Sequence, residues 1–198
     1  MNYVPVRNQA MVMTYKKETH GFSVLRNVMK YDIDVYFADV FYDKGNSDQN
    51  VIVYDNSSAL KALDWFHDHG VKVVSTTFVS SDPEIFKEFL SKAESYHMVV
   101  IVSSGNSPKL KQYYPMMNSG PVISIAAKQL TSVLFSDNMI ATNTDYVLNG
   151  NVYDLEGNTV NCGSSFAVSR AIYPIAKFVE DTGITDVEVI KKELDINV

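Results

Sequence analysis

Short runs of β-branched and aliphatic residues alternate with helix-like patterns along almost the whole chain. We expect strands at residues 10–15, 34–40, 71–78, 98–103 and 122–127. The last three runs are almost continuously apolar, which is typical of strands that are covered on both faces. Strands that alternate with helices in this way predict an α/β fold of three layers, helix, sheet and helix, around a mainly parallel twisted sheet.

Recognisable capping residues mark the ends of the expected helices. Ser57 or Ser58 is expected to cap a helix that ends at Gly70, and Asp82 to cap a second helix with Pro83 at its first position. Both helices would connect consecutive strands of the sheet.

The C-terminal third has a different pattern. Turn signals within residues 146–160 predict antiparallel hairpins ahead of a long helix that starts near Ser165 and ends near Asp181. A short helix is expected at 186–194. Because the sequence contains no repeat, low-complexity tract or linker, we expect residues 1–198 to form a single domain.

The composition excludes several classes of protein. Hydrophobic residues make up 46% of the 198 residues, enough for a sizeable core. The net charge of -6, without a basic stripe, argues against nucleic acid as a partner. No apolar run reaches the roughly 18 residues that a membrane span needs, and no secretory signal pattern is present, so we expect a cytoplasmic protein.

The chain contains a single cysteine, Cys162. It cannot form an internal disulfide or supply a zinc site, which agrees with a reducing compartment. Its place beside a turn favours a small buried residue over a second nucleophile.

Ligands of parallel sheets collect at the carboxyl ends of the strands, which directs attention to the polar turns there. Ser165 follows a Gly-Ser turn and precedes an apolar helix. Backbone N–H groups and the positive end of the helix dipole can stabilise negative charge at such a place. Ser165 is therefore a candidate nucleophile, with a helix cap or a close-packing position as the alternative.

Two further side chains at these turns suit the same chemistry. His20 lies at a helix start after the first expected strand, where it can act as a general base, whereas His67 and His69 fall in a last helical turn and are interpreted as structural. Asn106 ends a buried strand in a small-residue turn, from which its amide can donate to an oxyanion. An ordinary surface histidine and a simple Gly-Asn turn are the alternatives.

Three segments together resemble the subtilisin-like serine proteases, and they occur in that family's order. His20-Gly21 with Val24 resembles its His-Gly-Thr-His-Val motif, 99–107 its strand leading to a Gly-Asn oxyanion turn, and 163–167 its Gly-Thr-Ser-Met-Ala nucleophile turn. The resemblance implies a subtilisin-like sheet architecture. It also implies that Ser165 is the acylating nucleophile, His20 its general base, and Asn106 an oxyanion donor.

The same resemblance implies a substrate cleft. The backbone at 73–77 and at 103–105 would pair with an extended peptide by strand addition, so the implied substrate-binding residues are Thr76, Thr77, Ser103, Ser104 and Gly105. The expected substrate is a peptide or protein. No cofactor is implied, and because no acidic cluster has calcium-loop spacing, we expect no metal.

The family's catalytic aspartate has no counterpart at the expected place. Thr14 or Tyr15 stands there, and the candidate substitutes are Glu18, Asp39, an orienting hydroxyl from residue 14 or 15, or an acid from a partner protein. The resemblance therefore implies a serine endopeptidase that uses Ser165, His20 and Asn106, working as a Ser-His pair where no substitute acid completes the triad. The alternative is a pseudoprotease that binds a peptide or partner protein in the retained cleft. An α/β-hydrolase esterase is disfavoured, because no histidine follows His97.

Overall fold

A computed structural model describes residues 2–3, 20–43, 52–77, 84–106, 120–128, 144–153 and 159–196. Its helices are α1 (His20–Val28), α2 (Asn56–Asp68), α3 (Glu84–Ser95), α4 (Ser164–Thr182) and α5 (Val187–Glu193). Its strands are β1 (Asn2–Tyr3), β2 (Tyr36–Phe37), β3 (Phe41–Asp43), β4 (Ile52–Tyr54), β5 (Val73–Thr76), β6 (Val99–Ser103), β7 (Val122–Lys128), β8 (Tyr146–Asn149), β9 (Asn151–Tyr153) and β10 (Thr159–Cys162). The strand expected at 10–15 and the cap expected at Asp82 lie outside the described residues, as do Thr14, Tyr15 and Glu18.

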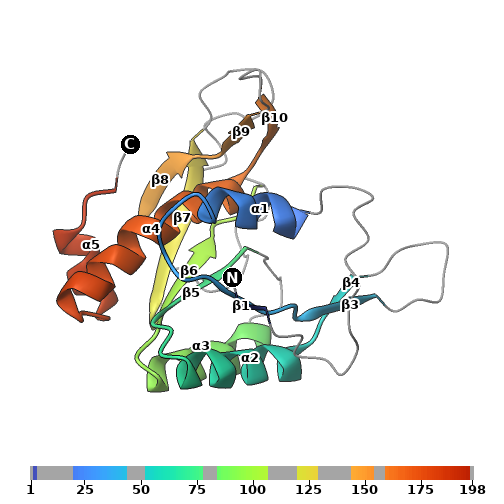
Figure 1. Cartoon of the computed structure of the whole chain (residues 1–198), viewed down its shortest axis with the longest axis vertical. Helices are drawn as coiled ribbons and strands as arrows, with labels where there is room; N and C mark the ends of the chain where they lie inside the picture. The colour runs from blue at the N-terminus through green and yellow to red at the C-terminus, as the bar shows by residue number, and fades with distance from the viewer. Residues whose placement is uncertain are drawn as a thin grey trace.

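A four-stranded parallel sheet, in the order β5-β6-β7-β8, forms the centre of the molecule (Figure 1). Val73 pairs with Val99, Val100 with Val122, and Ile125 with Tyr146 in this sheet. The strands expected at 71–78, 98–103 and 122–127 are confirmed, each within two residues.

Two expectations about strands were wrong in part. Residues 146–149 form β8, a parallel member of the main sheet, and only β9 and β10 form the expected antiparallel pair. Within 34–40, only Tyr36–Phe37 pairs, in parallel with β1, and β3 pairs antiparallel with β4. The physical reason is burial: no residue of the 34–40 segment is fully buried, so no continuous apolar strand forms there.

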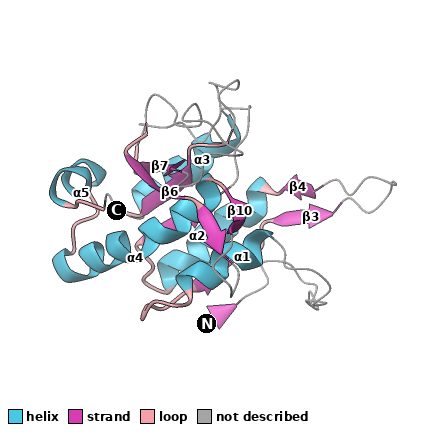
Figure 2. Ribbon diagram, turned by 90° about the horizontal axis from the view of Figure 1, so that it is seen from above, coloured by secondary structure: helices cyan, strands magenta, loops and turns pink. Residues whose placement is uncertain are grey.

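Both faces of the main sheet are covered by helices, as its apolar strands require. Val99 and Ile101 of β6 belong to a core that includes α4 and α5, whereas Val100 and Val102 belong to a core that includes α2 and α3. This alternation follows from the two-residue period of a strand. Figures 1 and 2 show α1 beside α4, and the two helices are in contact. The expected three layers are therefore present.

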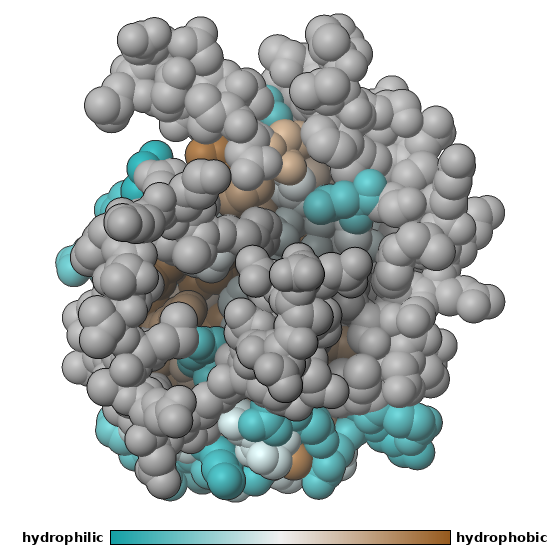
Figure 3. All heavy atoms as spheres, turned by 90° about the vertical axis from the view of Figure 1, so that its right-hand side faces the viewer, coloured by the Kyte–Doolittle hydropathy of each residue, from teal (hydrophilic) through white to brown (hydrophobic). Residues whose placement is uncertain are grey.

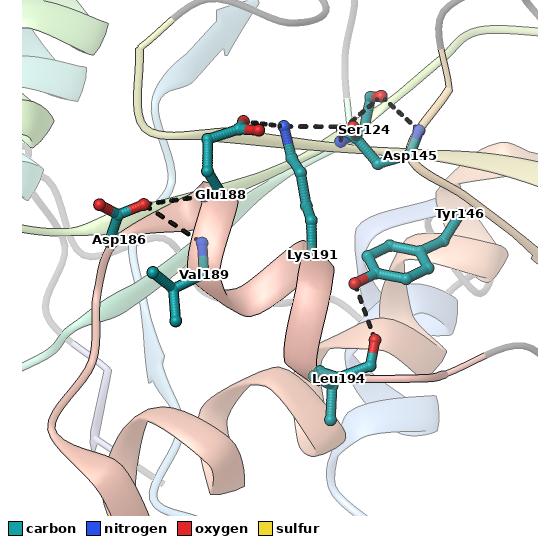
Figure 4. Close-up of polar contacts among 8 residues, drawn as sticks. All are labelled: Ser124, Asp145, Tyr146, Asp186, Glu188, Val189, Lys191 and Leu194. Carbon is teal, nitrogen blue, oxygen red and sulfur yellow. Dashed lines mark hydrogen bonds and ion pairs between the residues drawn. The ribbon is translucent and has the colours of Figure 1, made fainter.

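Helix α5 is attached to the sheet by polar contacts as well as by its apolar face (Figure 4). Lys191 binds Asp145 at 3.1 Å, and both side chains are largely buried. Asp145 in turn accepts hydrogen bonds from the backbone and the hydroxyl of Ser124. Although burial opposes the charged form, hydrogen bonds to Glu188 and Asp145 raise the pKa of Lys191. Asp186 caps α5, as its expected boundaries require.

Helix α2 is capped by Asp55, not by Ser57 or Ser58 as expected. The Asp55 carboxylate accepts from the Ser57 N–H at 3.1 Å and from the Ser58 hydroxyl at 2.5 Å. The two serines occupy the second and third positions of the helix, where Ser58 contributes its hydroxyl to the cap. The hydrogen bond from the Ser58 side chain is the main reason that the pKa of Asp55 lies below its ordinary value of 3.8.

We expect the replacement Asp55→Ala to lower the free energy of unfolding by about 1 kcal/mol at pH 7, because it removes the cap of α2. A carboxylate whose pKa is lowered by folding stabilises the protein above its unfolded-state pKa and loses that effect as the pH falls through the folded-state pKa. Urea unfolding should therefore show a difference at pH 7 that shrinks below pH 3.8. Asp55→Asn is the control, since an amide oxygen caps without titrating. A wild-type-to-Ala difference that stays constant down to pH 2 would contradict this cap.

Candidate active site

The turn that carries Ser165 connects β10 to α4. Gly163 is the N-cap residue of α4. As a glycine it has no side chain that could accept a hydrogen bond from the first N–H groups of the helix. The Gly163 N–H donates to the Gly150 carbonyl at 3.0 Å, which fixes the turn to the segment between β8 and β9. Ser165 is buried and lies in the first turn of α4, where unsatisfied N–H groups and the helix dipole favour negative charge.

Asn106 meets this turn from the end of β6. Its Oδ1 accepts from the Ser164 backbone N–H and from the Ser164 hydroxyl, both at 2.8 Å. Asn106 is exposed, and its Nδ2 is the heavy atom nearest to a Cβ built on Gly163, at 3.1 Å. The structure thus binds Asn106 to Ser164, the residue before Ser165, although the two positions are 58 apart in the sequence.

The hydroxyl of Ser165 donates to the backbone carbonyl of Thr77 at 3.3 Å. Thr77 directly follows β5, so the end of this strand also reaches the nucleophile turn. In the described part of the chain β5 pairs only with β6, and its other edge presents backbone groups. Such an edge is suited to pairing with an extended peptide.

An apolar cavity of about 330 Å³ lies beside this edge. Thr76, Thr77 and Gly21 line it together with apolar residues of α1, α2 and α3. The hydroxyl of Thr76 is buried and has no hydrogen-bond partner among the described residues. On the face seen in Figure 3, brown apolar surface is visible inside hollows.

Ser103 is the last residue of β6, and Ser104 and Gly105 follow it; all three are buried. The Ser103 and Ser164 hydroxyl oxygens are 2.5 Å apart, and the Gly105 N–H donates to Ser103 Oγ at 3.2 Å. The Ser104 hydroxyl is buried without a partner in the described ranges. These residues lie between Asn106 and the body of the sheet.

His20 is the first residue of α1, which packs against α4. The placement of its side chain lies outside what the structure describes, so its role as the general base for Ser165 stays a prediction. Asp39 lies between β2 and β3, and its role as a substitute acid likewise stays a prediction.

His67 and His69 occupy structural positions, and Cys162, expected to be buried, is half-buried. His67 stacks on Tyr96, and His69 is the C-terminal capping residue of α2, with its Nδ1 2.8 Å from the Trp65 carbonyl. Burial raises the pKa of the Cys162 thiol, which keeps it protonated and disfavours a second nucleophile.

Two residues of this site were not singled out from the sequence. Ser164 holds the Asn106 amide, and Gly150 holds Gly163. Ser164 was part of the nucleophile turn quoted from the sequence. Its hydrogen-bond partner, Asn106, depends on the fold and could not be predicted from that turn. Nothing local marks Gly150, because Asn149-Gly150 is also an ordinary turn signal.

Among the described residues, no helix is long and apolar enough to cross a membrane. Nor do these residues contain a group of three or more His, Cys, Asp and Glu side chains that could hold a metal ion.

Comparison with other sequences finds no matching family model and no matching curated protein. Comparison with solved structures finds similar folds. A cold-adapted subtilisin-like serine proteinase has a TM-score of 0.60 at 14% identity, covering 82% of this chain and 62% of that protein. The S41 psychrophilic protease has a TM-score of 0.57 at 18% identity, covering 81% and 59%. The prenylagaramide maturation protease PagA has a TM-score of 0.51 at 12% identity, covering 79% and 60%.

The chain therefore spans about three fifths of the length of the proteases that it resembles. At these identities the likeness concerns the backbone architecture. The described residues have the subtilisin-like α/β fold, with a mainly parallel sheet between helices.

Proposed function

We propose that this protein is a subtilisin-like serine endopeptidase, with Ser165 as the nucleophile, His20 as the general base and Asn106 as an oxyanion donor. The observation that carries the proposal is the pair of hydrogen bonds from Ser164 to Asn106 Oδ1. They hold the Asn106 side chain against Ser164, the residue before the proposed nucleophile at the N-terminus of α4, which supports a role of its amide as an oxyanion donor.

The reaction would begin with attack of Ser165 Oγ on the substrate carbonyl, while His20 takes the hydroxyl proton. The carbonyl oxygen becomes an oxyanion that accepts hydrogen bonds from Asn106 Nδ2 and the Ser165 N–H. His20 then returns the proton to the leaving amine, and water hydrolyses the acyl-enzyme. Before the attack, the Ser165 hydroxyl has to leave the Thr77 carbonyl to which it donates.

The substrate would be a peptide or protein that lies in extended form beside Thr76 and Thr77 and along Ser103–Gly105. Its backbone would pair with the edge of β5 that has no partner strand among the described residues, which would bring its scissile carbonyl near the nucleophile turn. The reaction uses side chains and backbone groups of this chain, and the proposal includes no cofactor.

The missing aspartate limits the proposed turnover. Loss of this acid from a Ser-His-Asp triad lowers turnover by about four orders of magnitude. The turnover would therefore depend on what orients His20. It could be a Ser-His pair without an acid, a substitute acid at Glu18 or Asp39, or an acid from a partner protein. The second candidate function, a pseudoprotease that binds a peptide or a partner protein, is favoured by this one departure in the sequence.

A serine-reactive fluorophosphonate probe tests the proposal. We expect covalent labelling of the folded protein at one residue, detected by intact mass and peptide mapping, and its complete loss in Ser165→Ala. Ser169→Ala is the matched control, since Ser169 is another buried serine of α4 but donates only to the Phe166 carbonyl of its own helix. Absence of labelling in well-folded protein would reject the peptidase and leave the peptide-binding pseudoprotease, to be tested by calorimetry with extended peptides.

A further inference from the structure

Three polar side chains from two distant segments form a continuous hydrogen-bonded chain behind the candidate oxyanion donor. Ser103 Oγ is 2.5 Å from Ser164 Oγ, and Ser164 Oγ is 2.8 Å from Asn106 Oδ1. The chain starts at the Gly105 N–H, which donates to Ser103 Oγ at 3.2 Å. Ser164 is fully buried and Ser103 is 3% exposed, so water does not compete for these bonds.

The direction of every bond in this chain can be derived from the number of protons. The Ser164 N–H can only donate, so the Asn106 atom that faces it must be the amide oxygen. Ser164 uses its single hydroxyl proton on the same oxygen. Ser103 must therefore donate its proton to Ser164, and it accepts from Gly105.

We propose that Ser103 and Ser164 are positioning residues that orient and polarise the Asn106 side chain, so that its NH₂ group faces the reacting carbonyl as a strengthened donor. This inference rests on the oxyanion role proposed for Asn106. Two hydrogen bonds to Oδ1 exclude the flipped amide, which would place NH₂ against the Ser164 N–H.

The direction of the bonds also affects the strength of the donor. In a chain in which each donor is itself an acceptor, every bond strengthens the next. An amide oxygen that accepts two bonds withdraws electron density from its nitrogen, and the N–H groups become better donors. An exposed Asn106 is thereby held in one orientation by buried groups, which reduces the reorganisation needed during the reaction.

The first test measures the orientation of Asn106 without any reaction. In ¹⁵N-labelled protein, the Asn106 NH₂ signals are assigned by their loss in Asn106→Asp, and their order parameter is measured by relaxation. We expect a rigid amide in the wild type and a clearly lower order parameter in Ser103→Ala and in Ser164→Ala. A mobile amide in the wild type, or an unchanged order parameter in both variants, would overturn the positioning role.

The second test measures the chemical consequence by the rate of fluorophosphonate labelling of Ser165. We expect Ser103→Ala and Ser164→Ala each to slow the labelling step roughly tenfold with unchanged probe affinity, as expected for coupled groups in one network. Threonine and valine have nearly the same volume, but only threonine keeps the hydroxyl. Ser165 should therefore be labelled roughly tenfold faster in Ser164→Thr than in Ser164→Val. In an Asn106→Ala background, Ser103→Ala should have no further effect.

The two tests separate failure of this inference from failure of the proposed function. If the wild type is not labelled, the peptidase is rejected, and the order parameters still decide whether Ser103 and Ser164 hold Asn106. If the wild type is labelled but the effects of Ser103→Ala and Asn106→Ala multiply, the peptidase stands and Ser103 does not act through Asn106. Thermal unfolding of each variant excludes loss of folded protein as the cause.

Discussion

Gly150→Ala is expected to destabilise the protein by about 3 kcal/mol, a decrease of about 6–12 °C in the melting temperature. A Cβ at this position would lie 2.6 Å from Ala127 Cβ and 2.7 Å from the Gly163 carbonyl oxygen. Neither neighbour is a flexible side chain, so β7 or the nucleophile turn has to move. Calorimetry or denaturant unfolding measures the change.

Gly21→Ala is the matched control and should have the opposite sign. Gly21 lies within α1, and a Cβ there would meet nothing within 4 Å. Alanine is preferred over glycine in a helix by roughly 0.5–1 kcal/mol, so this variant should be slightly more stable than the wild type. Equal stability of the two alanine variants would contradict the close approach at Gly150.

A double variant separates the two contacts of Gly150. Ala127→Gly removes the nearer of the two atoms but leaves the Gly163 carbonyl at 2.7 Å. We expect Gly150→Ala to cost less stability when it is introduced into the Ala127→Gly variant than when it is introduced into the wild type. Fluorophosphonate labelling of Ser165 should be slower than in the wild type in both Gly150→Ala and the double variant, because the clash with the Gly163 carbonyl displaces the nucleophile turn in both.

Asn106→Asp is expected to slow fluorophosphonate labelling of Ser165 by a factor of about 10² to 10³, the usual effect of removing one oxyanion donor. The carboxylate has nearly the same shape as the amide and still accepts both bonds from Ser164. Its second oxygen, however, replaces the NH₂ group that would face the developing negative charge. The variant therefore removes the donor and keeps the anchor.

The measurement is the second-order labelling rate, with the melting temperature as the control for folding. Because both Ser164 bonds are kept, we expect the melting temperature to stay within a few degrees of the wild type. A labelling rate within threefold of the wild type would show that Asn106 does not contact the reacting phosphoryl oxygen. The nucleophile turn would then have to stabilise the charge through backbone N–H groups alone.

Much of the sheet could be predicted from local sequence because its strands are buried on both faces. The run at 98–103 carries apolar residues at every position but its last, and the structure places them alternately in two cores. Such a run has few alternatives to a central strand. β8 was assigned to a hairpin instead, because its flanking turn signals are local whereas its pairing with β7 is not.

Helix boundaries, too, were predicted correctly where one local residue specifies them and incorrectly where several residues compete. The short helix at the C-terminus was predicted from Asp186 onward, and this residue does cap it through its own side chain. At α2 the sequence has four polar residues in a row before the apolar pattern: Asp55, Asn56, Ser57 and Ser58. Backbone geometry decided among them, since only Asp55 has the extended conformation of a cap.

The sequence by itself determined the α/β class, the central strands and the candidate roles of Ser165, Asn106 and His20, because residue type and local spacing specify which elements form and which chemistry is available. Only the tertiary structure decided that Asn106 binds Ser164, that Ser103 stands behind both, and that Gly150 leaves room for the Gly163 turn. These contacts join segments up to 61 residues apart. Their geometry depends on the packing of α4 against the sheet, which no local pattern encodes.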